Sequence, residues 1–276
     1  MKVQAQAKVN LALNVIGKRN DGYHELDMIM APISLYNDIE IDIHPVDQIT
    51  CDGGKIPDHS TIHKTLALLR KEVGLRNHYA IHVLKRIPDQ AGLAGSSADA
   101  AAVFRAVMAI EGIDLELVKQ LEFAKQIGAD VPFCLVNRLS RVQGIGEKIR
   151  VLSQGWKLSC LIVKPSYGIS TPEAFERWHA QAPVHVDVDA VEDAIQNQDF
   201  VSLCERMGNA LEKPAFQMRP ELQELKQKME ALGFDRVMMS GSGSSLMGFF
   251  HDPSHLKRAK ELCVGMDCFV EIVTIG

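Results

Sequence analysis

The sequence has no pair of cysteines at the C-x-x-C spacing, although it contains six cysteines among 276 residues. They are scattered through apolar segments, a pattern typical of buried thiols in a reducing cytosol. The six are Cys51, Cys134, Cys160, Cys204, Cys263 and Cys268. The sequence therefore predicts neither a disulfide framework nor a zinc site.

The chain also lacks a basic surplus and a long apolar run. Its 30 lysines and arginines are outnumbered by 35 aspartates and glutamates, and neither the first 150 residues nor the remainder has a basic excess. Nucleic-acid-binding proteins usually carry such an excess. No window approaches the ~18 apolar residues of a membrane span, and the first residues contain no apolar signal segment. We therefore expect a cytoplasmic protein that binds neither nucleic acid nor membranes.

What is present is an ordinary globular composition, with 46% apolar and 24% charged residues, in which strand and helix patterns alternate. Period-2 alternation predicts strands over 36–43 and 79–85. Helical spacing predicts helices over 60–73, 98–111 and 115–127, with Ser60 and Asp114 as N-caps and Gly128 as a stop.

The pattern changes character near residue 153. A strand over 159–163 follows, then acidic helices, then a strand, a Gly/Ser loop, a strand, a helix and a strand. Because a single core rarely grows to this length, we expect an α+β protein of two domains, 1–153 and 154–276.

A segment of small residues precedes the expected helix over 98–111. It reads Pro88-Asp89-Gln90-Ala91-Gly92-Leu93-Ala94-Gly95-Ser96-Ser97-Ala98-Asp99. Small residues let a backbone approach a ligand closely, and the free N–H groups at a helix start attract phosphate. The alternative is close packing of a small-residue helix without any ligand. Both common phosphate-binding fingerprints are absent.

A second loop, Ser240-Gly241-Ser242-Gly243-Ser244-Ser245, lies between the apolar segments 236–239 and 246–250. A simple hairpin connection would also explain it. Two such loops, one in each expected domain, favour a ligand held between the domains.

Polar residues near the N-terminus form a third candidate. Lys8 and Asn10 alternate with Ala7, Val9 and Leu11, so both point to one face of a strand. A solvated edge strand would give the same pattern. The following polar turn displays Tyr23 and His24, either as plain surface or as a stacking and hydrogen-bonding pair.

Asp130 is the fourth candidate. It stands between the helix stop at Gly128 and the apolar run 131–136. A carboxylate that enters a core is costly unless it is paired or functional. The alternative is an aspartate that caps a turn before Pro132.

Taken in order, these segments resemble the GHMP kinases, the galacto-, homoserine, mevalonate and phosphomevalonate kinases and their relatives. The resemblance runs from Ala7 to beyond Gly248. Its most specific parts are Ala7-Lys8-Val9-Asn10-Leu11, Gly22-Tyr23-His24-Glu25-Leu26, Gly128-Ala129-Asp130-Val131-Pro132-Phe133, Ile169-Ser170-Thr171-Pro172-Glu173-Ala174-Phe175 and Ser240-Gly241-Ser242-Gly243. The Tyr-His segment favours the branch that phosphorylates a cytidine-diphosphate-linked methylerythritol in non-mevalonate isoprenoid biosynthesis.

The resemblance implies an N-terminal domain like ribosomal protein S5 domain 2 and a ferredoxin-like C-terminal domain. It implies ATP and Mg²⁺ as cofactors, a small polyol substrate and a monomer or homodimer. In the family, residues matching Asp130 and Lys8 accept the hydroxyl proton and steady the developing charge.

The resemblance also assigns binding residues. The positions matched to ATP are Pro88, Ala91, Gly92, Leu93, Ala94, Gly95, Ser96, Ser97 and Asp99. Those matched to the substrate are Asn10, Tyr23, His24, Phe175, Gly241, Ser242 and Gly243, with Tyr23 and Phe175 on either side of the cytosine ring.

The glycine-rich loop departs from the family pattern G-L-G-G-G-S-S-D-A-A. Ala94 and Ser96 replace glycines, and Ala98 replaces a serine. A β-carbon beside a phosphate can weaken binding or shift the loop. Two other functions therefore stay open, namely a kinase for a different alcohol and a ligand-binding relative without turnover.

Overall fold

The computed structural model describes residues 1–52, 54–152, 155–179 and 184–276. The chain divides into two compact units, each assembled from separate segments. Unit 1 comprises residues 1–7, 35–87 and 94–137, and unit 2 comprises residues 8–34, 88–93 and 138–276. The boundary expected at residues 153 and 154 lies outside the described residues, so the division into 1–153 and 154–276 stays a prediction.

The sheet of unit 1 is built on the second half of strand β2 (His24–His44). β5 (His78–Leu84) pairs antiparallel with β2, β3 (Gln48–Cys51) pairs parallel with β5, and β4 (Gly54–Lys55) pairs antiparallel with β3. Ile39 and Ile41 are buried, as the alternation predicts, whereas Ile43 is exposed near the end of the strand. Both predicted strands of this region are confirmed.

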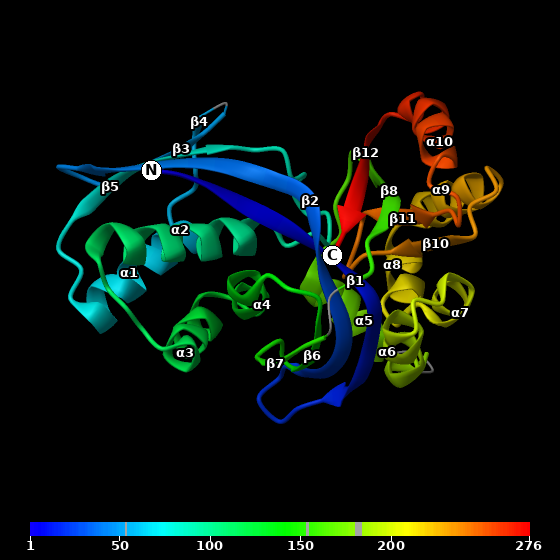
Figure 1. Cartoon of the computed structure of the whole chain (residues 1–276), viewed down its shortest axis with the longest axis horizontal. Helices are drawn as coiled ribbons and strands as arrows, with labels where there is room; N and C mark the ends of the chain where they lie inside the picture. The colour runs from blue at the N-terminus through cyan, green and yellow to red at the C-terminus, as the bar shows by residue number, and fades with distance from the viewer. Residues whose placement is uncertain (53, 153–154, 180–183) are drawn as a thin grey trace. The chain divides into compact units, whose positions relative to one another are not determined.

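Helices of unit 1 lie along one side of these strands, as Figure 1 shows for α1 and α2. They are α1 (Thr61–Val73), α2 (Gly95–Glu111), α3 (Leu117–Ile127) and α4 (Val131–Val136). Ser60 caps α1 by accepting a hydrogen bond from the His63 amide, as predicted. Asp114 as the N-cap of α3 is wrong, because that helix begins later and Glu116 occupies the cap position. Gly128 ends α3 as expected.

The main sheet of unit 2 is antiparallel, with the strand order β10-β11-β8-β12. Its strands are β8 (Leu158–Pro165), β10 (Arg236–Met239), β11 (Leu246–Phe249) and β12 (Cys268–Ile275). β8 is central and almost wholly buried. Helix α10 (His255–Val264) packs against β8 and β12. This confirms the predicted strand, loop, strand, helix and strand at the end of the chain.

The remaining strands of unit 2 include the N-terminal part of the chain and strands that pair around it. They are β1 (Lys2–Lys18), whose first residues belong to unit 1, β6 (Ser140–Gly144), β7 (Lys148–Val151) and β9 (Gly208–Asn209). β6 pairs with β2 and β7, and β9 pairs with β1. The helices are α5 (Thr171–His179), α6 (Val188–Gln196), α7 (Phe200–Arg206), α8 (Glu212–Met218) and α9 (Pro220–Glu230).

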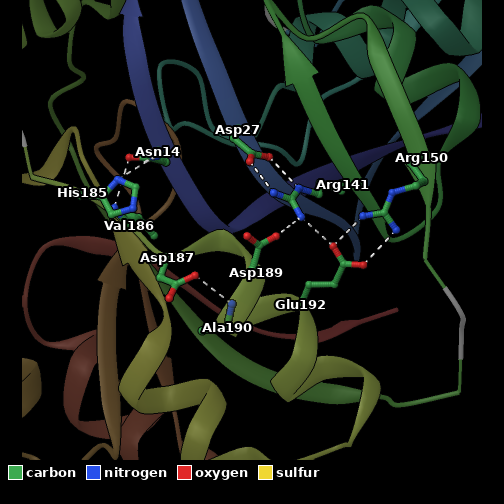
Figure 2. Close-up of polar contacts among 10 residues, drawn as sticks. All are labelled: Asn14, Asp27, Arg141, Arg150, His185, Val186, Asp187, Asp189, Ala190 and Glu192. Carbon is green, nitrogen blue, oxygen red and sulfur yellow. Dashed lines mark hydrogen bonds and ion pairs between the residues drawn. The ribbon is translucent and has the colours of Figure 1, made fainter.

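A cluster of charged side chains joins α6 to strands β2, β6 and β7 (Figure 2). Arg141 donates to both carboxylate oxygens of Asp27, at 2.9 and 2.6 Å, and to Glu192 at 3.1 Å. Arg150 donates to both oxygens of Glu192, at 2.9 and 2.7 Å. Hydrogen bonds from Arg150, and then from Arg141, hold the pKa of Glu192 below its ordinary value. The cluster therefore fastens α6 to the β-strands while Glu192 is ionised.

Glu192→Gln is expected to lower the free energy of unfolding by about 2 kcal/mol at pH 7, because it weakens charge-assisted hydrogen bonds of a side chain that is only 9% exposed. A carboxyl with a lowered pKa in the folded state stabilises the protein above its unfolded-state pKa and loses that effect as the pH falls. The difference between the two proteins should thus shrink below about pH 4. Urea unfolding at several pH values measures it. A difference that is independent of pH contradicts the assignment.

The cysteines are free thiols, as the sequence predicts. Cys134, Cys160, Cys204 and Cys263 are buried, whereas Cys51 and Cys268 are only partly covered. Burial raises the pKa of Cys204 to about 12, so this thiol is protonated at neutral pH. No helix among the described residues is long and apolar enough to cross a membrane.

Candidate active site

Lys8 and Asn10 share one face of β1, and both side chains are buried, with residue exposures of 4% and 1%. The alternative of a solvated edge strand is therefore wrong. Lys8 Nζ donates to Asn10 Oδ1 at 2.7 Å and to the Gly92 carbonyl at 3.1 Å. The Asn10 amide nitrogen Nδ2 lies 3.4 Å from Met28 Sδ on β2. The buried ammonium thus lies between the asparagine and the small-residue loop.

The small-residue loop is packed directly against the Gly/Ser loop of residues 240–245. Ser240 Oγ donates to the Gly92 carbonyl at 3.2 Å and accepts from the backbone N–H of Asn10 at 3.3 Å. Gly92 has a φ of +71°, and a methyl group placed on it would lie 2.0 Å from the Ser240 carbonyl oxygen. This contact needs glycine at position 92 and brings together the two loops that the sequence singled out.

Residues that sequence reasoning did not select support the Gly/Ser loop. Asn209 Nδ2 donates to the carbonyls of Met239 and Gly241, both at 2.8 Å. Thr171 Oγ1 lies 2.7 Å from Ser242 Oγ. Thr171 stands in a segment that resembles the family, so a signal was present for it, but no spacing rule links Thr171 or Asn209 to the distant residues that they contact.

The predicted ATP-binding positions differ in what they contribute to the structure. Ala91 and Leu93 are buried and contribute backbone, since the Ala91 carbonyl accepts from the Ser245 amide and the Leu93 carbonyl from the Lys8 amide. Gly95, Ser96 and Ser97 form the first turn of α2, where N–H groups have no partner within the helix. Pro88 is half-buried and begins the loop.

Ala94 occupies the N-cap position of α2 in the left-handed region, with a φ of 57°. A β-carbon costs roughly 1–2 kcal/mol in this region, and glycine avoids that cost. The departure from the family's glycine therefore stores strain next to the first turn of α2.

We expect Ala94→Gly to stabilise the protein by up to about 1 kcal/mol, since the strain relieved exceeds the backbone entropy that glycine loses on folding. Ala109→Gly, the same substitution at an exposed position within α2, serves as the matched control and should destabilise by about 0.5–1 kcal/mol. Thermal unfolding of both variants measures the opposite signs. Destabilisation of similar size at both positions contradicts the interpretation.

A cavity of about 330 Å³ opens beside the first turn of α2 in unit 1. Thr61 Oγ1 donates to the Ser96 carbonyl at 2.6 Å, and Asp99 Oδ1 accepts from Asn37 Nδ2 at 2.8 Å. The cavity is lined by Ile56, Pro57, His59, Ser60, Thr61, Ile62, Lys85, Ser96 and Asp99. Its size suits a small molecule. Thr61 and Lys85 are further candidates that the sequence analysis missed.

Asp130 stands at the N-cap position of α4, but its side chain makes no capping hydrogen bond there. The capping alternative therefore does not account for it. A methyl group placed on Gly128 would lie 4.0 Å from Ser97 Oγ, which brings the segment before α4 to the first turn of α2. Asp130 belongs to unit 1 and Lys8 to unit 2, and their pairing remains a prediction.

Arg105 ties α2 to the opposite end of α4. Arg105 is half-buried, and its guanidinium donates to the carbonyls of Cys134 and Leu135, at 2.8 and 3.3 Å. These carbonyls belong to the last turn of α4, where orphan acceptors need a partner. Arg105 thus holds the helix that begins after Asp130 against α2.

An aromatic cluster forms around His24 in unit 2. The His24 ring stacks on Phe175, with centroids 4.7 Å apart, and contacts Trp178 edge-on at 6.0 Å. Burial lowers the pKa of His24, and His179 and Lys18 lower it further, so the ring is neutral near pH 7. Tyr23 is 58% exposed. The cluster brings His24 and Phe175 together and leaves Tyr23 accessible.

Comparison with known sequences connects these features. The chain matches the GHMP kinases N terminal domain over residues 60–138 and the GHMP kinases C terminal region over residues 191–262. It belongs to the GHMP kinases. The resemblance noted from the sequence is confirmed, as are the mixed α/β content and the two-domain GHMP kinase fold.

Several GHMP kinases are similar over nearly the whole chain. The 4-diphosphocytidyl-2-C-methyl-D-erythritol kinase of Geobacillus sp. (strain WCH70) is 37% identical over 93% of this chain and 90% of its own length. Its counterpart from Bacillus cytotoxicus is 35% identical over the same shares. A crystal structure of 4-(cytidine 5'-diphospho)-2C-methyl-D-erythritol kinase superposes with a TM-score of 0.84 and 32% identity, covering 100% of this chain and 99% of that one.

More distant GHMP kinases share the fold. Homoserine kinase from Cytophaga hutchinsonii has a TM-score of 0.75 at 15% identity, covering 100% of this chain and 94% of its own. Similarity at this level concerns the fold alone.

Proposed function

We propose that this chain transfers the γ-phosphoryl group of ATP to the 2-hydroxyl of 4-diphosphocytidyl-2-C-methyl-D-erythritol. The observation that carries the proposal is the buried ammonium of Lys8, which lies between Asn10 and the small-residue loop. The whole-length similarity to kinases named for this substrate supports it. In this proposal the part before residue 154 is the ATP-binding and catalytic domain and the part after it the substrate domain.

ATP would bind at the first turn of α2. The amides of Gly95, Ser96 and Ser97 would meet the phosphates, because a helix N-terminus attracts anions. The neighbouring cavity, with its apolar wall and the polar groups of Thr61 and Lys85, would receive the nucleoside. Gly92 and Ala91 would shape the loop through their backbone contacts with the Gly/Ser loop.

Mg²⁺ would accompany ATP without a dedicated protein cage. No group of three or more metal-ligating side chains occurs in the described part of the chain. Oxygen ligands suited to Mg²⁺ are nevertheless available in the Ser96 and Ser97 hydroxyls and the Asp130 carboxylate, and this ion usually keeps waters and binds mainly through substrate phosphates. When bound, it neutralises phosphate charge.

Asp130 would accept the proton of the acceptor hydroxyl, and Lys8 would stabilise charge on the transferred group. On the substrate side, Tyr23 and Phe175 would stack on the cytosine ring, and His24 and Asn10 would supply hydrogen bonds. Gly241, Ser242 and Gly243 would line the same side.

The test is ADP release with the cytidylyl substrate, compared with a panel of other alcohols. We expect phosphorylation of 4-diphosphocytidyl-2-C-methyl-D-erythritol to exceed that of any alcohol without the cytidine group. A preference for another alcohol would assign a different acceptor. Tight binding of ATP and substrate without product would instead indicate a ligand-binding protein.

A further inference from the structure

One buried lysine of unit 2 lies outside the residues considered so far. Lys164 is the penultimate residue of β8, the central strand of the main sheet of unit 2, and is 7% exposed. Its neighbours along the strand are apolar, from Leu161 to Val163. A buried ammonium is expensive unless hydrogen bonds compensate its lost hydration.

Lys164 finds those hydrogen bonds in the connection between β8 and α5. Its Nζ donates to the Pro165 carbonyl at 2.9 Å and to the Tyr167 carbonyl at 3.0 Å. Burial lowers the pKa of Lys164, while Asp89 and Cys268 oppose this effect. The ammonium therefore folds the 165–167 segment back over the end of β8.

The same segment holds the Gly/Ser loop. The Tyr167 carbonyl also accepts a hydrogen bond from Ser244 Oγ at 2.6 Å, so Lys164 and Ser244 share one acceptor. Ser244 is completely buried. The Tyr167 carbonyl thus links Lys164 to the Gly/Ser loop.

The small-residue loop is hydrogen-bonded to the Gly/Ser loop. The amides of Ser244 and Ser245 donate to the carbonyls of Gln90 and Ala91, at 3.3 and 3.2 Å. Gly168 packs so closely on Gln90 that a methyl group on the glycine would lie 2.2 Å from Gln90 Oε1. Two residues after Gln90, the Gly92 carbonyl accepts from Lys8.

We propose that Lys164 is a positioning residue. It fixes where the Gly/Ser loop and the small-residue loop lie relative to the end of β8, and through them it fixes the position of the Lys8 ammonium. Replacing a purely structural lysine by an apolar side chain of similar length would lower stability alone, because the Pro165 and Tyr167 carbonyls would lose their donor. A positioning lysine would not be replaceable, because a displacement of about 1 Å in a reacting group can cost roughly 100-fold in rate.

The first test needs no ligand and no activity. Hydrogen–deuterium exchange of Lys164→Met should show amides in the 240–245 segment exchanging at least about tenfold faster than in the wild type, because their carbonyl anchor is loosened. Lys260→Met is the matched control, since this partly exposed lysine pairs with Glu271 and belongs to α10. Equal exchange in the two variants overturns the proposal.

The second test uses activity and rests on the proposed kinase function. Lys164→Met should lower kcat/KM for ATP roughly 10- to 100-fold, and Lys164→Arg should recover part of the loss. Lys260→Met should retain wild-type values. A Lys164→Met enzyme with unchanged kcat and KM overturns the proposal.

Ser244→Ala keeps the question answerable if Lys164→Met fails to fold. Because Ser244 and Lys164 share the Tyr167 carbonyl, Ser244→Ala should shift exchange and kcat/KM in the same direction, and the double variant should lose less than the product of the two single losses. Wild-type exchange in Ser244→Ala contradicts the shared anchor. If the wild-type chain releases no ADP with any alcohol, the kinase function fails, and exchange still decides the role of Lys164.

Discussion

Asp130→Asn is expected to lower kcat by about 10²- to 10⁴-fold while leaving the fold intact. Asparagine has the shape of aspartate but does not accept the hydroxyl proton, and a general base typically contributes a factor of this size. The side chain of Asp130 makes no capping hydrogen bond, so its replacement removes no helix cap. Steady-state ADP release and thermal unfolding, measured on the same preparation, separate the two effects.

The matched control for this variant is Asp114→Asn. Asp114 is exposed and lies between α2 and α3. Its replacement by asparagine changes the net charge of unit 1 by the same amount as Asp130→Asn. It should retain full activity. A loss of less than about 10-fold in Asp130→Asn would remove the assigned role, since water or another group would then be accepting the proton.

Gly92→Ala is expected to have the largest effect on stability. The added methyl group would overlap the Ser240 carbonyl oxygen at 2.0 Å, and alanine is itself strained at a φ of +71°. Backbone strain of about 1–2 kcal/mol and overpacking of about 1–3 kcal/mol together predict a loss of roughly 2–5 kcal/mol. Activity should fall further than stability explains, because the Gly92 carbonyl also accepts from Lys8.

Gly112→Ala isolates the contact from the strain. Gly112 has a φ of +65°, and nothing lies within 4 Å of a methyl group placed there. This variant should therefore lose only about 1–2 kcal/mol and keep its activity. Urea unfolding of both variants gives the difference. Equal losses would mean that the close approach of the two loops does not constrain position 92.

Local patterns predicted several structural features around the candidate site correctly. Alternation placed Lys8 and Asn10 on one face of a strand, since successive side chains of a strand point to opposite sides. Composition singled out both glycine loops, and cap chemistry located the start of α1 at Ser60 and the end of α3 at Gly128. Each of these features depends on residues within a few positions of one another.

Patterns failed where a choice depended on distant neighbours. Asp114 is a good capping residue, yet α3 begins after Glu116, whose carbonyl accepts from the amides of Lys119 and Gln120. Period-2 alternation in β2 did not foresee that Ile43 is exposed. Sequence also offered no reason to examine Lys164, whose acceptors are backbone carbonyls that any residue type would supply.

The amino-acid sequence alone was sufficient for the family, through its resemblance to known kinases, and for most element types, through short-range periodicity. The burial of Lys8 and Asn10 required the folded chain, since Ser240 reaches Asn10 across 230 positions. So did the contact of Gly92 with Ser240 and the shared acceptor of Lys164 and Ser244. The physical reason is that a strand pattern specifies which side chains share a face, whereas desolvation and hydrogen bonding depend on what the rest of the chain packs against that face.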